Sequence, residues 1–152
     1  MTTAWRLCKR GRFPMAFDGR GAAASPGRWN PRGARAVYLA ENRSLAALEV
    51  LANAGARELL ASASWTIVPV HFDPAWVHLP RKLPADWRTT PAPASTRALG
   101  GAWLAGKATP LLRVPSAVTL GEFNYLLNPL HNDFPKVEIG KPEDFTFDGR
   151  VL

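Results

Sequence analysis

Proline and glycine divide this chain so finely that it has little room for long helices or long strands. Its 152 residues include 14 prolines and 12 glycines. Five prolines fall within residues 73–94, and four glycines with two prolines fall within residues 19–33. Proline fixes its own backbone and glycine permits tight turns, so both stretches are predicted to be irregular connections. Residues 19–33 in particular are predicted to be a loop rather than a helix or a long strand.

The hydrophobic pattern between these connections predicts several short strands. Apolar and β-branched runs place them at residues 36–40, 65–72 and 111–114, with shorter ones near residues 137–139 and 145–147. Pro69 interrupts the second run, and a proline cannot donate a hydrogen bond to a neighbouring strand. The strand at residues 65–72 is therefore predicted to lie at a sheet edge or to contain a bulge.

The same pattern predicts two helices. Ser44 is expected to be the N-cap of the first, and past Gly55 the helical pattern resumes up to Leu60. Ser95 is expected to cap the second, which runs to about residue 105. With few helices, several short strands and long loops, residues 1–152 are predicted to form a single α+β domain.

The composition is that of a folded protein without disulfides or membrane spans. Hydrophobic residues make up 47% and charged residues 20% of the chain, which excludes a mostly disordered polypeptide. Cys8 has no partner for an internal disulfide, and no apolar run reaches the roughly 18 residues of a membrane helix. Without a signal-peptide pattern, a cytoplasmic location is expected. The three histidines and Cys8 lack metal-ligand spacing, so no metal site is predicted.

All of the net positive charge lies in the first 43 residues. The formal net charge is +7. Residues 1–43 contain nine basic and two acidic side chains, whereas residues 44–152 contain ten of each. Eight of the nine basic residues are arginines, whose planar guanidinium groups bind phosphate or carboxylate through two hydrogen bonds. This block either attracts a polyanion, such as nucleic acid, an acidic protein or a phosphate, or forms a solvated basic surface.

Glu49 falls on the apolar side of the first predicted helix. Leu45, Leu48 and Ala52 recur with it at the i, i+3, i+4 and i+7 spacing of one helix face. A carboxylate there costs free energy unless it is paired or faces a cleft. Glu49 is therefore either a glutamate at the edge of the stripe that pairs with an arginine, or a cleft-facing carboxylate. In the second case it would act on a developing positive charge or on a hydroxyl.

Two further residues are candidates for ligand contact. Tyr38 lies within the strand predicted at residues 36–40, where small alanines on its face leave room for the ring. It is either an aromatic platform for a flat ligand or a half-buried strand tyrosine. Arg28 lies in the loop between Gly27 and Pro31, just before that strand, and is either a ligand contact or a surface arginine.

Several segments, spread over nearly the whole chain, together resemble one protein family. They are Trp5-Arg6, Gly27–Asn30, Val37–Ala40, Leu48-Glu49, Val114–Ser116, Asn124–His131, Phe145–Asp148 and Arg150–Leu152. With them, the chain is similar to the RES-domain toxins of bacterial RES–Xre toxin–antitoxin pairs. The order and spacing of Arg28, Tyr38 and Glu49 make this resemblance more specific than any single motif.

The resemblance implies an ADP-ribosyltransferase-like α+β fold with short strands around an NAD cleft. NAD would be the substrate, and no metal would be needed. Members of the family hydrolyse or phosphorolyse NAD, or transfer ADP-ribose to a protein target. Their partner is an Xre-type helix-turn-helix antitoxin that blocks the NAD site, so that DNA is contacted only through the antitoxin.

The resemblance also implies roles for individual residues, and residue chemistry agrees with them. Cleavage of the nicotinamide–ribose bond passes through an oxocarbenium-like transition state, which a carboxylate stabilises. The pyrophosphate of NAD needs cations, and the flat nicotinamide ring suits stacking on an aromatic side chain. The expected catalytic residues are Glu49, Tyr38 and Arg28, and the expected NAD-binding residues are Arg6, Arg28, Tyr38, Ser116 and Asn124.

Other functions remain open at this point. A basic nucleic-acid-binding module would use the N-terminal arginines, although no helix-turn-helix, zinc-finger or RNA-binding signature accompanies them. A partner-binding module without catalysis would use the same basic surface. For the enzyme, the acceptor of ADP-ribose is water, phosphate or a protein side chain. Likeness in length and in the C-terminal segment favours the compact transferase-type members of the family.

Overall fold

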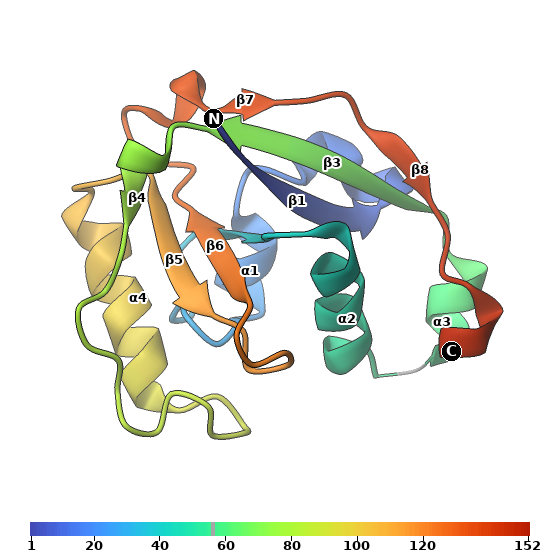
Figure 1. The fold of residues 1–152 in the computed structure, drawn as a ribbon, viewed down its shortest axis with the longest axis horizontal. Helices are drawn as coiled ribbons and strands as arrows, with labels where there is room; N and C mark the ends of the chain where they lie inside the picture. The colour runs from blue at the N-terminus through green and yellow to red at the C-terminus, as the bar shows by residue number, and fades with distance from the viewer. Residues whose placement is uncertain (56) are drawn as a thin grey trace.

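One twisted sheet forms the middle of the molecule in this computed structural model, which describes residues 1–55 and 57–152 (Figure 1). Within these residues the sheet has eight strands in the order β4-β5-β6-β2-β1-β3-β7, with β8 also paired to β3. Only β4 and β5 run parallel among the described pairs, and all others are antiparallel. The strands are β1 (Thr2–Lys9), β2 (Val37–Ala40), β3 (Trp65–Phe72), β4 (Val77–His78), β5 (Leu111–Pro115), β6 (Phe123–Leu127), β7 (Glu138–Ile139) and β8 (Glu143–Phe145).

Four α-helices and four 3-10 turns connect the described strands. In Figure 1, α4 stands beside β4 and β5, whereas α2 lies below β1 and β2. None of the helices in the described part of the chain is long and apolar enough to cross a membrane. The helices are α1 (Arg20–Ala24), α2 (Arg43–Asn53), α3 (Arg57–Ser62) and α4 (Ala94–Gly106), and the turns are η1 (Arg10–Met15), η2 (Pro74–Trp76), η3 (Phe134–Lys136) and η4 (Gly149–Val151).

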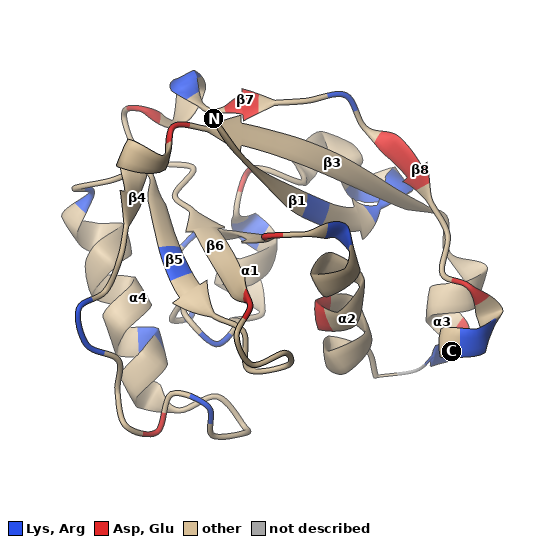
Figure 2. Ribbon diagram, viewed as in Figure 1, with Lys and Arg blue, Asp and Glu red and all other residues tan. Residues whose placement is uncertain are grey.

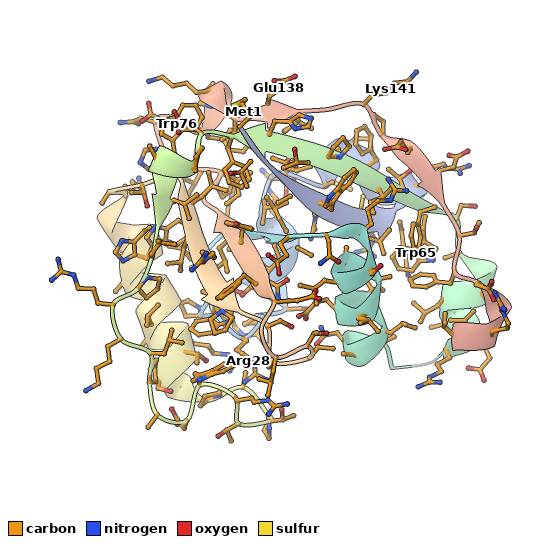
Figure 3. All side chains as sticks on the ribbon, viewed as in Figure 1. Met1, Arg28, Trp65, Trp76, Glu138 and Lys141 are labelled. Carbon is orange, nitrogen blue, oxygen red and sulfur yellow. The ribbon has the colours of Figure 1, made fainter. Side chains whose placement is uncertain are left out.

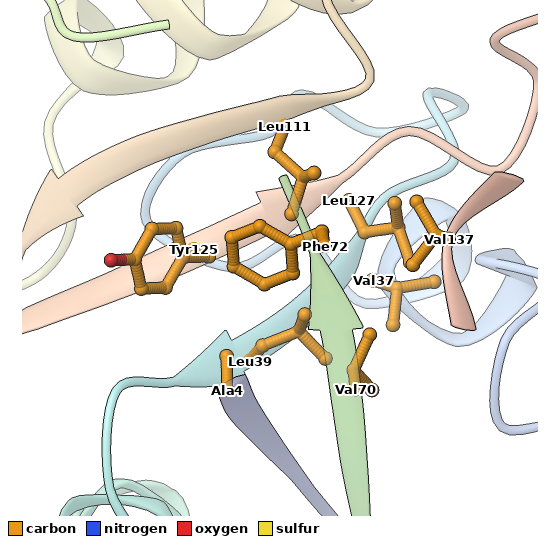
Figure 4. Close-up of a cluster of buried hydrophobic side chains, with 9 residues drawn as sticks. All are labelled: Ala4, Val37, Leu39, Val70, Phe72, Leu111, Tyr125, Leu127 and Val137. Atoms are coloured by element: carbon orange, nitrogen blue, oxygen red, sulfur yellow. The ribbon is translucent and has the colours of Figure 1, made fainter. Parts of the chain in front are cut away.

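Side chains alternate across the sheet, so each face buries its own set of hydrophobic residues. One face carries a single cluster centred on Phe72, whose ring packs edge-on against Tyr125 (Figure 4). The other face carries two clusters. Leu45 of α2 and Ile67 of β3 belong to the first, and Trp103 of α4 belongs to the second. The space between α2 and α4 separates these two clusters.

The sheet separates between β1 and β2. Eight residue pairs align β1 with β3, but among the described residues β1 and β2 are in register only at Trp5 and Ala40. Beyond this pair the guanidinium group of Arg6, rather than a strand backbone, donates a hydrogen bond to the carbonyl oxygen of Tyr38, at 3.2 Å. The separation opens the sheet beside these two residues.

Most of the predicted strands form where the pattern placed them. Residues 65–72 are β3, and β2 and β5 differ from their predicted ranges by one residue. Of the two alternatives predicted at Pro69, the sheet edge is wrong, because β3 pairs with β1 on one side and with β7 and β8 on the other. Beside Pro69 the partner side has one extra residue, since the pair Ile67–Glu143 is followed by the pair Val70–Ile139. The nitrogen and carbonyl of a strand residue point to the same side, and the Pro69 oxygen accepts from Gly140. Pro69 therefore occupies the break between the last pair of β8 and the first pair of β7.

The predicted helix caps are wrong in detail. Asn42, not Ser44, is the N-cap of α2, since its Oδ1 accepts from the Leu45 nitrogen at 2.7 Å and Ser44 lies inside the helix. Ser95 does not cap α4, which begins one residue earlier at Ala94, and its hydroxyl donates to Asp86 instead. Proline at the preceding position already fixes an extended backbone there, so α4 starts without a side-chain cap.

Other elements differ from the prediction. The region 19–33 contains the short helix α1, which starts after Gly19 in the left-handed conformation and runs through three alanines. Residues 73–94 contain the two-residue strand β4, and the strand expected near 145–147 spans Glu143–Phe145. Strands β1 and β6 were not predicted, because charged or polar side chains interrupt their apolar residues.

Candidate active site

A cavity of about 1230 Å³ lies beside the separation of β1 and β2, lined by residues of β1, α1, α2 and the turn before β2, with Arg97 of α4. This exceeds the roughly 300–1,000 Å³ of most small-molecule pockets. Figure 2 shows basic segments on β1, α1 and α4 and an acidic segment in the middle of α2. Two acidic residues, Asp18 and Glu49, line the cavity. Six basic residues line it as well: Arg6, Lys9, Arg12, Arg20, Arg28 and Arg97.

The six cations of the cavity have no acidic partners among the residues that the structure describes. The four ion pairs found there lie elsewhere and involve Arg10, Arg43, Lys136 and Arg150. Five of the six cavity cations belong to the basic block of residues 1–43. A cavity with more positive than negative charge attracts an anionic ligand, and its partly enclosed walls strengthen that attraction.

Arg6 is the most deeply placed of these cations. Burial lowers the pKa of Arg6 from its usual value, and the nearby Cys8 thiolate would oppose this shift. One guanidinium nitrogen donates to Tyr38, but Nε is buried without a hydrogen-bond partner. A buried, unsatisfied donor on a charged group costs free energy, so the protein retains Arg6 here at the expense of stability.

Arg28 and Arg97 both line the cavity, and both donate hydrogen bonds to backbone carbonyl oxygens. Arg28 donates to the carbonyl oxygens of Trp87 and Thr89, at 3.0 and 2.6 Å, so neutral dipoles hold it and leave its charge uncompensated. Figure 3 places Arg28 in the space between α4 and α2. Arg97 of α4 donates from Nε to the carbonyl oxygen of Gly27 at 3.4 Å. Arg97 therefore bonds the backbone of the turn that carries Arg28.

Glu49 faces the cavity from α2 and is held by Asn124 of β6 and by Ser116, which directly follows β5. Its Oε1 accepts from the Ser116 hydroxyl at 2.8 Å and from the Asn124 amide at 2.7 Å. The predicted apolar stripe is wrong, because Leu48 and Ala52 are exposed. Glu49 shares its helix face with Ala46, Val50 and Asn53, which also line the cavity.

Ser116 and Asn124 differ in their access to the cavity. Ser116 is fully buried, and its Oγ also accepts from the backbone nitrogens of Val118 and Thr119. It therefore lies behind Glu49 and orients the carboxylate. Asn124 lines the cavity, and its Oδ1 is buried without a hydrogen-bond partner. With both donors directed at Oε1, no hydrogen bond of the described residues occupies Oε2 of Glu49.

Tyr38 is fixed at both its backbone and its hydroxyl. The hydroxyl accepts from the Trp29 nitrogen at 3.0 Å and donates to Oδ1 of Asn30 at 2.7 Å. The ring lines the cavity close to Gly27, where an added Cβ would lie 2.6 Å from the tyrosine oxygen. Burial raises the pKa of Tyr38, so the phenol stays neutral and acts as a hydrogen-bonding group rather than as a base.

The tyrosine pKa shifts predict a measurable pH dependence. At pH 10, the ordinary pKa of tyrosine, the folded protein should show less tyrosinate than the unfolded chain, because burial raises the pKa of both Tyr38 and Tyr125. Above pH 10 the unfolded chain loses protons that the folded chain keeps, so these groups lower the free energy of unfolding as pH rises. Ultraviolet titration with and without denaturant measures this. Equal tyrosinate signals at pH 10 would contradict it.

The structure brings the predicted residues Arg6, Arg28, Tyr38, Glu49 and Asn124 to one cavity, with Ser116 behind it. Sequence reasoning missed two residues. Arg97 is the single charged residue in the 13-residue helix α4, and a lone charge in an apolar helix was the available signal. Asn30 is fully buried, although the sequence marks it only as one residue of the Gly27–Asn30 segment. Among residues 1–55 and 57–152, no group of His, Cys, Asp and Glu is arranged to hold a metal ion.

Fold and cavity together define a class of protein: a small α+β domain whose open sheet presents one oriented carboxylate within an arginine-rich cavity. The chain belongs to the RES domain family, whose sequence profile matches residues 3–148. The family and the α+β fold predicted from the sequence are thereby confirmed.

Curated relatives match this chain over almost its full length. A protein named Toxin Res from Yersinia enterocolitica is 34% identical over 148 residues, which cover 97% of either chain. A protein named Prs ADP-ribosylating toxin from a Sphingobium species is 33% identical and covers 100% of this chain and 98% of its own length. Among solved structures, the MbcT–MbcA toxin–antitoxin complex of M. tuberculosis is similar with a TM-score of 0.74 and 19% identity, covering 95% of this chain and 84% of that one. At this identity the last likeness concerns the fold.

Proposed function

We propose that this protein is the toxin of a toxin–antitoxin pair, and that it cleaves NAD at the nicotinamide–ribose bond and transfers ADP-ribose to an acceptor. The observation that carries the proposal is the Glu49 carboxylate. Ser116 and Asn124 hold one of its oxygens, and it stands in a cavity of uncompensated arginines. Such a cavity combines a group that stabilises positive charge with groups that bind phosphate.

The carboxylate would act on the charge that develops as the bond breaks. The bond between nicotinamide nitrogen and ribose C1′ carries its electron pair away with nicotinamide, which leaves neutral, and C1′ gains oxocarbenium character. Glu49 would stabilise that charge and accept a hydrogen bond from a ribose hydroxyl through Oε2. The acceptor then adds its lone pair at C1′ and loses a proton. Ser116 and Asn124 keep the carboxylate from rotating during these steps.

The arginines and Tyr38 would bind the remainder of NAD. Its pyrophosphate carries two negative charges, which arginine side chains can bind. Arg6, with its unpartnered Nε, and the two arginines at the turn before Tyr38, Arg28 and Arg97, line the cavity and suit this role. The ring of Tyr38 offers a flat surface for nicotinamide. The residues present therefore fit this substrate in charge, and NAD would supply hydrogen-bond partners for the two buried polar atoms that lack them, Arg6 Nε and Asn124 Oδ1.

A protein side chain is the acceptor that we propose. The Sphingobium relative is named as an ADP-ribosylating toxin, and its length is nearly that of this chain. Water or phosphate would instead give free ADP-ribose or its 1″-phosphate. We place the reaction in the cytoplasm, where a chain with a single buried cysteine finds both NAD and protein targets.

An antitoxin of the Xre helix-turn-helix type is the proposed partner, and it would act by covering the cavity. The solved structure with the same fold is a toxin–antitoxin complex. At the rim, the side chains of Leu59 and Val118 are exposed and line the cavity, and exposed Leu48 precedes Glu49. Apolar side chains beside a charged opening suit a protein partner.

Mass spectrometry of the purified chain with NAD tests the proposed function. The time course is run in buffer, with phosphate, and with a cytosolic extract. Nicotinamide release is expected in at least one condition, and a protein with the mass increment of ADP-ribose identifies transfer. A folded chain, free of antitoxin, that releases no nicotinamide under any of these conditions would refute the proposal.

Replacing Arg6 by methionine is expected to separate stability from ligand binding. Removing the desolvated charge with its unsatisfied Nε should raise Tm, whereas losing the hydrogen bond to the Tyr38 carbonyl oxygen should lower it, so the net change should stay within about 4 °C, or about 1 kcal/mol. The further rise in Tm that saturating NAD produces should shrink, because a phosphate contact is lost. Arg10→Met removes an exposed, ion-paired arginine outside the cavity and should change neither quantity appreciably. Undiminished stabilisation by NAD in Arg6→Met would contradict the assignment of Arg6.

A further inference from the structure

Asn30 is fully buried, yet every polar atom of its side chain has partners. Its Oδ1 accepts from the Gly27 nitrogen at 2.9 Å and from the Tyr38 hydroxyl at 2.7 Å. Its Nδ2 lies within 2.9–3.3 Å of three carbonyl oxygens, those of Ala22, Pro31 and Ala34. A carboxamide without these bonds would be costly to bury among the apolar side chains around it.

The partners of Asn30 belong to the segments that carry two of the cavity residues. Gly27 and Pro31 enclose the turn that presents Arg28, and Tyr38 is the aromatic residue of β2. The Trp29 nitrogen donates to the same tyrosine hydroxyl, at 3.0 Å. The carboxamide of Asn30 therefore joins the turn that carries Arg28 to the Tyr38 ring, because its Oδ1 accepts from both the Gly27 nitrogen and the Tyr38 hydroxyl.

Close packing leaves this arrangement little freedom. A Cβ on Gly27 would lie 2.6 Å from the Tyr38 oxygen, so the turn backbone already contacts the phenol. On the outer side, the Thr96 hydroxyl of α4 donates to the Arg28 carbonyl oxygen at 2.7 Å. The turn is held from both sides, and on the tyrosine side the bonds come from the Asn30 carboxamide and from the Trp29 nitrogen.

We propose that Asn30 is a positioning residue, which sets the Tyr38 ring and Arg28 in their ligand-binding arrangement before NAD arrives. The expected change in KM rests on the proposed function, whereas the expected displacement of the Tyr38 ring does not. Groups that are held in place before binding lose less conformational freedom when the ligand binds, so affinity rises. Removing Asn30 leaves the tyrosine hydroxyl without its acceptor and the turn without its inner support.

The expected kinetic result is a change in KM that exceeds the change in kcat. Asn30→Ala should raise KM for NAD at least about tenfold, because small displacements of binding groups are costly. Tyr38→Phe keeps the ring and the three carbonyl bonds of Asn30 but removes the hydroxyl through which Asn30 acts. It should raise KM in the same direction by a smaller factor, and it decides the proposal if Asn30→Ala does not fold.

Asn128→Ala is the matched control. Asn128 is also a buried asparagine, and it bonds the backbone of Leu104 and Leu130, away from the tyrosine. Both alanine variants should lower Tm, since each leaves buried backbone groups without partners. Only Asn30→Ala should raise KM, which a merely structural role would not produce.

A second measurement does not depend on activity. The chain has two tyrosines, so labelling with 3-fluorotyrosine gives two fluorine resonances, and Tyr38→Phe assigns them. Asn30→Ala should shift or broaden the Tyr38 resonance, while Asn128→Ala leaves it in place. If the Tyr38 resonance and KM both stay at their wild-type values in Asn30→Ala, the positioning role is refuted. If wild-type protein cleaves no NAD, the proposed function fails, and the fluorine spectrum alone decides the role of Asn30.

Discussion

Replacing Glu49 by glutamine is expected to lower the rate of nicotinamide release about 10³-fold while the protein stays folded. Glutamine is almost isosteric, and its carbonyl oxygen can still accept from Ser116 and Asn124 at the position of Oε1. What disappears is the negative charge that, in the proposed mechanism, would face C1′ of the ribose. Because that charge matters mainly after positive charge has developed, kcat should fall far more than KM rises.

Glu41→Gln is the matched control for this prediction. Glu41 is also partly buried and also accepts a hydrogen bond through Oε1, from the Phe123 nitrogen at 2.9 Å, but it does not line the cavity. The two variants remove the same charge a short distance apart in the sequence. The two variants should therefore differ in nicotinamide release, but not in circular dichroism or Tm. Full activity in Glu49→Gln would remove Glu49 from the mechanism.

The sequence predicted that Glu49 faces a cleft or pairs with an arginine, but it gave no sign of the residues that surround it. The i, i+3, i+4 pattern indicated a carboxylate among apolar residues, yet Leu48 of that pattern is exposed. A helix of 11 residues has several overlapping apolar faces, and the strands packed against it decide which one is buried. The partners Ser116 and Asn124 are 67 and 75 residues away in sequence, so no local pattern joins them to Glu49.

The two missed strands have a common physical cause. Strand β1 contains Arg6 in its middle and β6 contains Asn124, and a polar residue within an apolar run normally argues against burial. Both side chains project toward the cavity, where a ligand rather than the protein would satisfy them. Local rules of folding thus fail at the residues that the proposed function requires, which is where such conflicts are expected. Asn30 escaped notice for a related reason, because an asparagine between glycine and proline is typical of any turn.

Gly100→Ala is expected to lower the free energy of unfolding by about 3 kcal/mol, and Tm by roughly 10 °C. A Cβ at Gly100 would overlap the carbonyl oxygen of Trp29, which is backbone and cannot rotate away. The turn cannot retreat easily either, because the Trp29 side chain is buried and Thr96 bonds the neighbouring Arg28 carbonyl. Helix α4 therefore packs directly against the backbone of the turn that carries Arg28.

The same contact couples stability to the cavity. If α4 moves outward to admit the methyl group, Arg97 and the Arg28 turn move with it, so Gly100→Ala should also weaken the stabilisation by NAD. Gly106→Ala is the control in the same helix, since a Cβ there meets nothing within 4 Å, and alanine should leave Tm unchanged or raise it. Denaturant unfolding of both variants, with and without NAD, measures the two effects together. Equal stability of Gly100→Ala and Gly106→Ala would show that α4 does not need the close approach to Trp29.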